Sequence, residues 1–487
     1  MATSLRFGAI VNIIGRLVAI DALILLMPMA VSLCYGESDW LSFLIAACAA
    51  AITGSVAIFA TRHRRESIRA REGFIITASI WVVFGLFGII PFMTCENPIG
   101  FTDAMFEIIS GYTTTGASVI RDVEAMSHGI LFWRALSQWI GGLGIIMFML
   151  ALLPELNKAV GISMFNAEAT GITHDKIHPR IRQTALSIWA VYLTLTILST
   201  VMLWLGPMDF FDSVCHTFTA IATGGFSTRN DGVMYWHSDY VLTVLTGVMF
   251  IGGLNFLLLF NVWKGDLKGL ARNAVIRTFI WIIVAAYLMM LLAAIIRQES
   301  VSIDNLLVYP LFHVISAITS TGFSITGAEQ WGPFALFLTI LLMLCGSCAG
   351  STAGGIKVVR VVLLFKNSFT EMKRIIHPNA VINVKYDGKS VHPTVMTGVM
   401  AFFILFMIVF SIGSIIMAIF TDDIATACSA VISCMSNIGP GFGSIGPMDN
   451  FSHLSDAAKL FCAALMLIGR LEVFTVLVLF SKAFWKR

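Results

Sequence analysis

The chain has 487 residues, of which 57% are hydrophobic and only 12% carry a charge. Soluble domains carry about 25% charged residues, so this chain has too little polar surface to face water on all sides. The composition therefore excludes a soluble globular protein and indicates a polytopic membrane protein in the lipid bilayer. The net charge of +3 says little by itself, and we expect no nucleic-acid partner.

About ten apolar segments are long enough to cross a bilayer as a helix of about 20 residues. The first contains Arg16 and Asp21 and lacks a small-residue cleavage site, which favours a retained helix over a signal peptide. The sequence thus predicts an all-α polytopic fold. The ten segments lie near 9–33, 40–60, 73–93, 129–153, 183–205, 239–262, 276–296, 332–360, 394–420 and 458–483.

The loops between these segments alternate in charge. Most lysines and arginines lie in 61–71, 174–182, 264–277, 366–389 and the C-terminal end. The positive-inside rule places these loops and both termini in the cytoplasm. The opposite loops are acidic, and an acidic exterior would raise the local cation concentration at an outer vestibule.

Four uncharged, glycine-containing motifs lie on the outer side. Each follows an apolar segment of about ten residues, half the length needed to cross a membrane. We aligned the motifs on Gly116, Gly224, Gly322 and Gly439. They read SGYTTTGASV (110–119), AIATGGFST (220–228), AITSTGFSI (317–325) and MSNIGPGFG (435–443).

Each motif alone is typical of a re-entrant turn, but four in related units indicate a shared cavity on a pseudo-fourfold axis. Non-helical backbone at membrane depth is tolerated only where it is buried in protein or lines a water-filled cavity. Extended backbone there can direct carbonyl oxygens at a bare cation in place of its water. Glycine accepts the positive φ that such a turn needs, and the C-terminal ends of four half-helices add a negative field.

These motifs resemble the Trk/Ktr/HKT superfamily of potassium transporters, closest to its TrkH-type members. The resemblance implies an N-terminal transmembrane helix pair followed by four helix–pore-loop–helix repeats around one ion pore. The helix pair would occupy residues 1–65. The four repeats would occupy 66–158, 159–265, 266–366 and 367–487.

The resemblance also implies which residues form a potassium-binding selectivity filter. Relatives that pass sodium often have serine at the first filter glycine, so glycine at all four positions favours potassium. The fourth loop departs from the pattern as N-I-G-P-G, which predicts an asymmetric filter. The filter residues implied are Thr114, Thr115, Gly116, Ala222, Thr223, Gly224, Ser320, Thr321, Gly322, Asn437, Ile438 and Gly439.

A second glycine-rich stretch, MLCGSCAGSTAGGIKVVR, covers residues 343–360. Each glycine costs a helix about 1 kcal/mol, so the segment is expected to break into a loop. In the resembling family the corresponding loop is an intramembrane gate, whereas the alternative is close helix packing through small residues. Lys357 and Arg360 are expected to snorkel to the cytoplasmic surface. The gate residues implied are Gly346, Ser347, Gly350, Ser351, Thr352, Gly354 and Gly355.

The last apolar segment contains Arg470 and Glu472. A charge within a membrane usually faces a cavity or a partner. In the family the matching arginine faces the pore beneath the filter; the alternative is a salt bridge of Arg470 with Glu472 or another buried acid. Asp21 could likewise pair with Arg16. Of the polar residues on the half-helices, we expect Glu107, Cys215, His216 and His313 to pack behind the filter.

The sequence therefore predicts potassium uptake across the bacterial inner membrane. The resemblance further implies a homodimer and a cytoplasmic nucleotide-binding regulatory subunit of the TrkA kind. A sodium-permeable member of the superfamily and a proton- or sodium-coupled symporter remain as alternatives. The symporter would need an acidic relay, for which Asp21, Glu107 and Glu472 are the candidates. An enzyme is not expected, and neither is a covalent cofactor.

Overall fold

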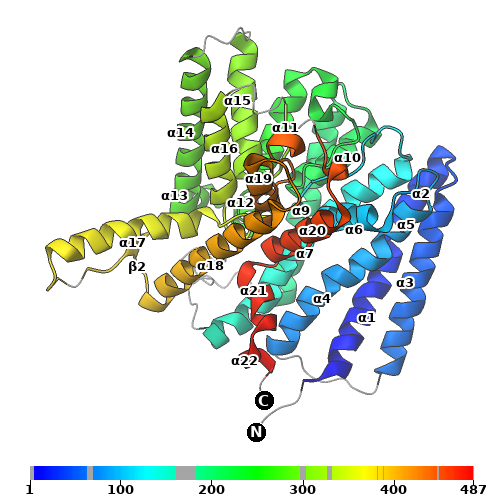
Figure 1. The fold of residues 1–487 in the computed structure, drawn as a ribbon, viewed down its shortest axis with the longest axis horizontal. Helices are drawn as coiled ribbons and strands as arrows, with labels where there is room; N and C mark the ends of the chain where they lie inside the picture. Colours follow the sequence, from blue (N-terminus) through cyan, green and yellow to red (C-terminus); the bar gives the residue numbers. More distant parts are fainter. Residues whose placement is uncertain are drawn as a thin grey trace.

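The computed structural model describes residues 5–62, 70–160, 181–296, 303–325, 332–380, 382–387, 389–446 and 449–485, without the side chains of 70, 145–160, 181–183, 303–306, 389 and 483. It is almost entirely helical (Figure 1), which confirms the predicted fold class. In the part of the chain that the structure describes, the one small sheet pairs β1 (Lys385–Tyr386) with β2 (Lys389–Ser390). The basic loops 61–71 and 174–182, and the proposed boundary at residue 65, fall largely outside the described residues.

The N-terminal helices α1 (Phe7–Ile24), α2 (Leu26–Tyr35) and α3 (Trp40–Ala60) form a layer at one side of the bundle (Figure 1). Helices α1 and α3 approach closely because glycines face each other: a Cβ at Gly54 would lie 2.8 Å from the carbonyl oxygen of Gly15. Asp21 does not pair with the exposed Arg16. Its carboxylate instead accepts a hydrogen bond from the Tyr112 hydroxyl at 3.0 Å, which ties this layer to the rest of the protein.

Four units of similar construction follow, each with a half-length helix that ends inside the bundle. These half-helices are α6 (Phe101–Tyr112), α10 (Phe210–Ile221), α15 (Ile303–Ile318) and α19 (Ile424–Ser436). The helix before each is α4 (Ala70–Gly88) with α5 (Ile90–Thr94), α9 (Ile181–Trp204), α14 (Ala274–Ile296) or α18 (Pro393–Met417). The helices that follow them are α7 (His128–Val160), α11 (Asp239–Gly252), α16 (Gly332–Cys345) and α20 (Asp456–Arg470).

Within the described residues, six helices are long and apolar enough to cross a membrane, and two bent helix pairs bring the number to eight. Three of the ten predicted segments are thus not straight spans. Residues 239–262 form α11 and α12 (Phe256–Trp263), which meet at 104°. Residues 458–483 form α20, α21 (Val473–Leu477) and η5 (Val478–Phe480), with a bend of 111° after α20. Residues 332–360 form α16, a loop, and the start of α17 (Val358–Ile376).

The bend between α11 and α12 has a local cause. The carbonyl oxygen of Gly253 accepts a hydrogen bond from the Cys348 N–H, so it is used by the loop after α16 rather than by its own helix. The side chain of Asn255 then caps α12 by accepting hydrogen bonds from the N–H groups of Leu257 and Leu258. An inserted partner and a new N-cap are a sufficient reason for a sharp bend. Apolar periodicity does not report either feature.

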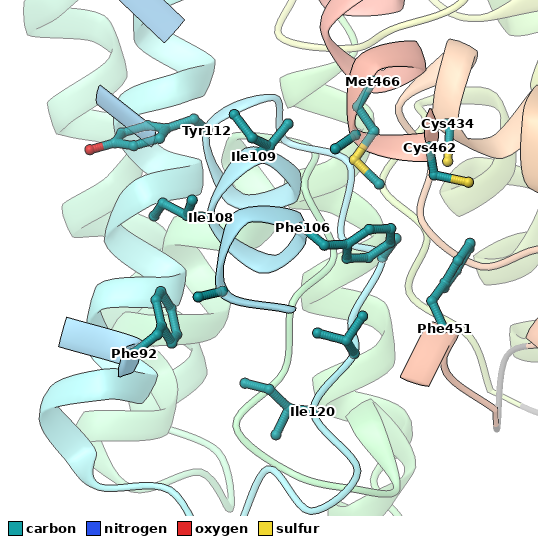
Figure 2. Packing of buried hydrophobic residues seen from close by; sticks show 14 of the residues in the cluster. Phe92, Phe106, Ile108, Ile109, Tyr112, Ile120, Cys434, Phe451, Cys462 and Met466 are labelled. Atoms are coloured by element: carbon teal, nitrogen blue, oxygen red, sulfur yellow. The ribbon is translucent and has the colours of Figure 1, made fainter. Parts of the chain in front are cut away.

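Half-helix α6 shows how these short elements are held (Figure 2). Phe106 points towards Phe451, with ring centroids 5.2 Å apart, while Tyr112 lies on the opposite side of the helix. Tyr112 packs edge-on against Trp133 of α7 at 6.0 Å. Because both sides of α6 are buried against other elements, the helix is fixed in position although it is too short to span a membrane.

Candidate functional site: a ring of four pore loops

The four half-helices end in the same backbone geometry. A left-handed residue is the second after the ends of α6, α10 and α15 and the first after the end of α19, with φ of 53° at Thr114, 53° at Thr223, 52° at Ser320 and 53° at Asn437. Such values are rare for threonine and serine and mark strained backbone, which is common at functional sites. In each loop the next residue donates its N–H to a carbonyl of the half-helix, at 2.7 to 3.0 Å.

A glycine comes directly after each of these N–H donors, which are Thr115, Gly224, Thr321 and Ile438. The φ values of these glycines are positive: 82° at Gly116, 77° at Gly225, 80° at Gly322 and 102° at Gly439. The equivalent of Gly116 in the second loop is thus Gly225, one residue later than the alignment from the sequence. The shared G-F-S of 225–227 and 322–324 could have revealed this register. Gly224 corresponds to Thr115, and Ala222 lies at the level of Thr113.

The glycines close the loops into a ring. A Cβ at Gly116 would lie 2.0 Å from the carbonyl oxygen of Gly224, and one at Gly225 would lie 2.0 Å from that of Thr321. A Cβ at Gly322 would lie 1.7 Å from the oxygen of Ile438, and one at Gly439 would lie 2.6 Å from that of Thr115. Each glycine therefore touches the carbonyl of the next loop in cyclic order. We call these eight residues the filter ring.

Polar side chains of the half-helices support the ring from behind. Glu107 pairs with Arg134 of α7 at 2.8 Å and accepts the Val119 N–H at 2.9 Å. His216 contacts the hydroxyl of Ser227 at 3.0 Å, and His313 contacts that of Thr339 at 2.8 Å. All three side chains are buried, as is Cys215. These residues pack behind the loops, as expected.

A hollow of about 290 Å³ lies on one side of the ring and is lined by all four ring glycines. Its charged lining residues are Arg121, Arg134, Arg229, Asp231 and Asp449. The lining is therefore not uniformly acidic, which corrects our expectation for the vestibule. The side chains of Glu107 and Asp212 neutralise Arg134 and Arg229 through ion pairs of 2.8 and 2.7 Å.

A loop of residues 346–357, here called the glycine-rich loop, lies on the opposite side of the ring. The N–H of Gly354 donates to the hydroxyl of Ser320 at 2.6 Å. The hydroxyl of Thr352 contacts that of Thr223 at 3.3 Å and donates to the carbonyl of Gly252 at 3.1 Å. Of the predicted gate residues, Thr352 and Gly354 thus contact left-handed residues of the pore loops directly. The full set of predicted gate residues lies within this loop: Gly346, Ser347, Gly350, Ser351, Thr352, Gly354 and Gly355.

Arg470 holds this loop from the last repeat. Its guanidinium donates to the carbonyl oxygens of Thr352 at 2.6 Å and of Gly141 at 3.1 Å. Glu472 pairs with Arg360 at 3.0 Å, so the alternative Arg470–Glu472 salt bridge is wrong. Lys357 and Arg360 are buried rather than snorkelled, because the Ala353 carbonyl accepts from Lys357 and Glu472 neutralises Arg360.

Two supporting residues were missed at the level of sequence. Arg134 and Gln138 lie one turn apart on α7 and both reach the second pore loop. Arg134 donates to the Ser227 carbonyl at 3.0 Å, and Gln138 donates to the Gly224 carbonyl at 2.8 Å. Their spacing of four residues, inside an apolar segment, was a signal that one helix face carries polar groups.

Four pore loops in a closed ring, with half-helix C-termini directed at it, define the class of pore-loop cation-conducting membrane proteins. The profile of the family described as "TrkH: Cation transport protein" matches residues 41–487. The chain belongs to this family, which consists of transport proteins and not of enzymes.

The chain is similar over nearly its whole length to curated relatives. It is 36% identical to the Trk system potassium uptake protein TrkH of Salmonella typhimurium, covering 99% of this chain and 100% of the relative. It is 31% identical to TrkG of Escherichia coli, with 98% of each covered. The crystal structure of the potassium transporter TrkH from Vibrio parahaemolyticus matches with a TM-score of 0.91 and 34% identity, over 99% of this chain and 100% of that one.

Proposed function

We propose that this protein takes up potassium across the bacterial inner membrane through the filter ring. The observation that carries the proposal is the cyclic contact between each ring glycine and the carbonyl of the next loop. Such contacts fix the carbonyl oxygens around one axis, where they replace the hydration shell of a potassium ion. The C-terminal ends of α6, α10, α15 and α19 add their partial negative charge.

The predicted filter residues enter this proposal with one change of register. The filter carbonyls are Thr114, Thr115, Thr223, Gly224, Ser320, Thr321, Asn437 and Ile438, together with the four ring glycines, so that Gly225 joins the set. Asn437 replaces a hydroxyl residue with an amide, whose Nδ2 donates to the Thr115 hydroxyl at 2.9 Å. This supports an asymmetric filter.

The glycine-rich loop is proposed as the gate. It contacts three of the four pore loops on the side opposite the vestibule, and Arg470 holds it in that position. The positive charge of Arg470 next to the ion path would repel cations until the loop moves. Glycines at φ of 66°, 76° and 76° (Gly346, Gly350 and Gly355) supply the backbone freedom for such a movement.

A coupled symporter receives less support. The three acids that could form its relay each have a partner in the structure. Asp21 accepts from Tyr112, Glu107 pairs with Arg134, and Glu472 pairs with Arg360. We further propose cytoplasmic termini, from the basic loops, and a homodimer, from the family resemblance. We also propose regulation by a cytoplasmic nucleotide-binding subunit of the TrkA kind, because the curated relatives are named as components of the Trk system.

The experiment is growth of a potassium-uptake-deficient bacterium on limiting potassium, with the wild-type chain or Gly116→Ser. Serine at Gly116 places a Cβ against the Gly224 carbonyl, at a φ of 82°. We expect rescue by the wild type and weakened or sodium-permeable uptake by the variant. Equal rescue by both would show that the first loop does not line the filter. Failure of both, with expression and regulatory subunit confirmed, would favour the coupled symporter.

A further inference from the structure

The second pore loop differs from the others in what stands behind it. At the ring position occupied by Thr115, Thr321 and Ile438 it has Gly224. A Cβ at Gly224 would lie 2.4 Å from Cδ and Oε1 of Gln138. The side chain of Gln138 therefore fills the space that the other loops give to their own side chain.

Both polar atoms of Gln138 are used on this loop. Nε2 donates to the carbonyl oxygen of Gly224 at 2.8 Å, and Oε1 accepts the N–H of Phe226 at 3.2 Å. The orientation of the amide is fixed chemically, because the Phe226 N–H can only donate and the Gly224 oxygen can only accept. Gln138 is fully buried, so losing either partner would leave a buried polar group unsatisfied.

The Gly224 carbonyl, which accepts the hydrogen bond from Gln138, is also the carbonyl that contacts the first pore loop. The oxygen of Gly224 lies where a Cβ of Gly116 would be, and Gln138 belongs to α7, the helix that follows the first loop. One amide thus fixes the junction between the first and second quarters of the filter ring. Arg134, one turn earlier, donates to Ser227 and lies 4.2 Å from the Phe226 ring centroid, so α7 holds both ends of this loop.

The sister repeats provide an internal reference. Gly141, Gly252 and Gly469 occupy matching places, since a Cβ at each would meet the carbonyl two residues before the left-handed residue of its own repeat. Three residues before them stand Gln138, Met249 and Met466. The methionine side chain has no N–H to donate, so of these three repeats only the first has the carbonyl clamp.

We propose that Gln138 is a positioning residue that sets ion selectivity by holding the Gly224 carbonyl in the filter ring. A carbonyl held by a donor cannot move inwards to a smaller ion, which disfavours sodium relative to potassium. The proposal rests on the proposed function, because it assigns a determinant of selectivity to that same filter.

The test is Gln138→Met, the residue that two sister repeats already carry at this place. Purified wild type and variant are reconstituted in liposomes, and potassium and sodium uptake are measured separately. Losing one net hydrogen bond of about 1 kcal/mol corresponds to about fivefold, so we expect the potassium-to-sodium ratio to fall about fivefold. Met249→Leu, a change at the matching position in the second repeat, should leave the ratio unchanged.

A purely structural role is separated by thermal unfolding in potassium, sodium and choline salts. If Gln138 positions a filter carbonyl, Gln138→Met reduces the extra stabilisation that potassium gives over sodium. A uniform loss of stability in all three salts, with an unchanged uptake ratio, would overturn the proposal while leaving potassium uptake intact. Absence of potassium uptake by the wild type would instead overturn the proposed function and this inference with it.

A double-mutant cycle adds a second readout. Gly224→Ala alone places a methyl group on the Gln138 amide and should strongly reduce uptake. In the Gln138→Ala background that methyl group has room, so the same substitution should cost at least tenfold less, which corresponds to about 1.4 kcal/mol of coupling. Additive effects would mean that the two residues do not share the space as described.

Discussion

The filter ring and the glycine-rich loop have similar compositions but are held in different ways. In the ring, Gly116, Gly225, Gly322 and Gly439 are each packed against the carbonyl of the next loop, so a side chain added at any of these four meets backbone. The glycine-rich loop meets backbone at Gly354, whose Cβ would lie 2.1 Å from the Ser436 carbonyl oxygen, but it is also held by side-chain hydrogen bonds. The Thr352 hydroxyl donates to the Gly252 carbonyl, the Ser320 hydroxyl accepts the Gly354 N–H, and Arg470 donates to the Thr352 carbonyl. Contacts between backbones can only be removed by moving whole segments, whereas side-chain hydrogen bonds can be exchanged. From this comparison we expect glycine to build a rigid ring in one place and a loop that can move in the other.

The largest effect is expected from Gly225→Ala. Its Cβ would lie 2.0 Å from the Thr321 carbonyl oxygen at a φ of 77°, so the ring must open. We expect potassium uptake to fall by more than about tenfold, since a clash of this kind costs well above 1.4 kcal/mol. Gly232→Ala is the matched control. Gly232 has a φ of 58° and nothing within 4 Å of an added Cβ. Similar losses in both variants would show that backbone strain alone is responsible.

The second-largest effect is expected from loss of the hydrogen bonds by which Arg470 holds the glycine-rich loop. Arg470→Gln removes the guanidinium that bonds to Thr352 and Gly141. A hydrogen bond from a charged group contributes about 1.5–3 kcal/mol, so rubidium flux through reconstituted protein should rise about tenfold or more without a regulatory subunit. Arg374→Gln, which removes an exposed charge on α17, should leave the flux unchanged. A reduced flux in Arg470→Gln would contradict a closed loop held by this residue.

A smaller effect is expected from Thr352→Val, which keeps the shape but removes the hydroxyl. That hydroxyl donates to the carbonyls of Ile221 and Gly252 at 3.1 Å each. The net loss of about 1 kcal/mol predicts an increase in rubidium flux of about fivefold. The control is Thr246→Val, whose hydroxyl donates within its own helix, to Leu242. Equal fluxes in the two variants would show that Thr352 does not restrain the loop.

The smallest effect is a pH dependence at the start of α19. Hydrogen bonds from the side chain and N–H of Thr426 lower the pKa of the Asp423 carboxyl. A lowered folded-state pKa means that this stabilisation is present above the unfolded-state pKa and is lost as the pH falls through the folded-state value. Asp423→Asn should therefore flatten the acid side of the stability profile and change stability by at most about 1 kcal/mol, since the group is exposed. If the stability of the variant fell as steeply at acid pH as that of the wild type, the pH dependence would come from other carboxylates.

Most of the architecture could be predicted because it depends on patterns that a sequence displays. Apolar segment length, basic loops and repeated glycine motifs are local. The bends at Gly253 and Glu472 could not be predicted, because they depend on contacts with the glycine-rich loop and with Arg360, which are distant in the chain. The one-residue shift in the second loop has a similar cause. Two adjacent glycines permit either register, and the contact of Gly225 with Thr321 decides between them.

The central claim is that potassium is bound by the carbonyls of the filter ring. The most direct measurement is an experimental structure with rubidium, located by anomalous scattering. The account predicts rubidium on the common axis, enclosed by the carbonyls of Thr115, Gly224, Thr321 and Ile438 and the four ring glycines. Rubidium held by side-chain carboxylates between the helices, with none inside the ring, would contradict it.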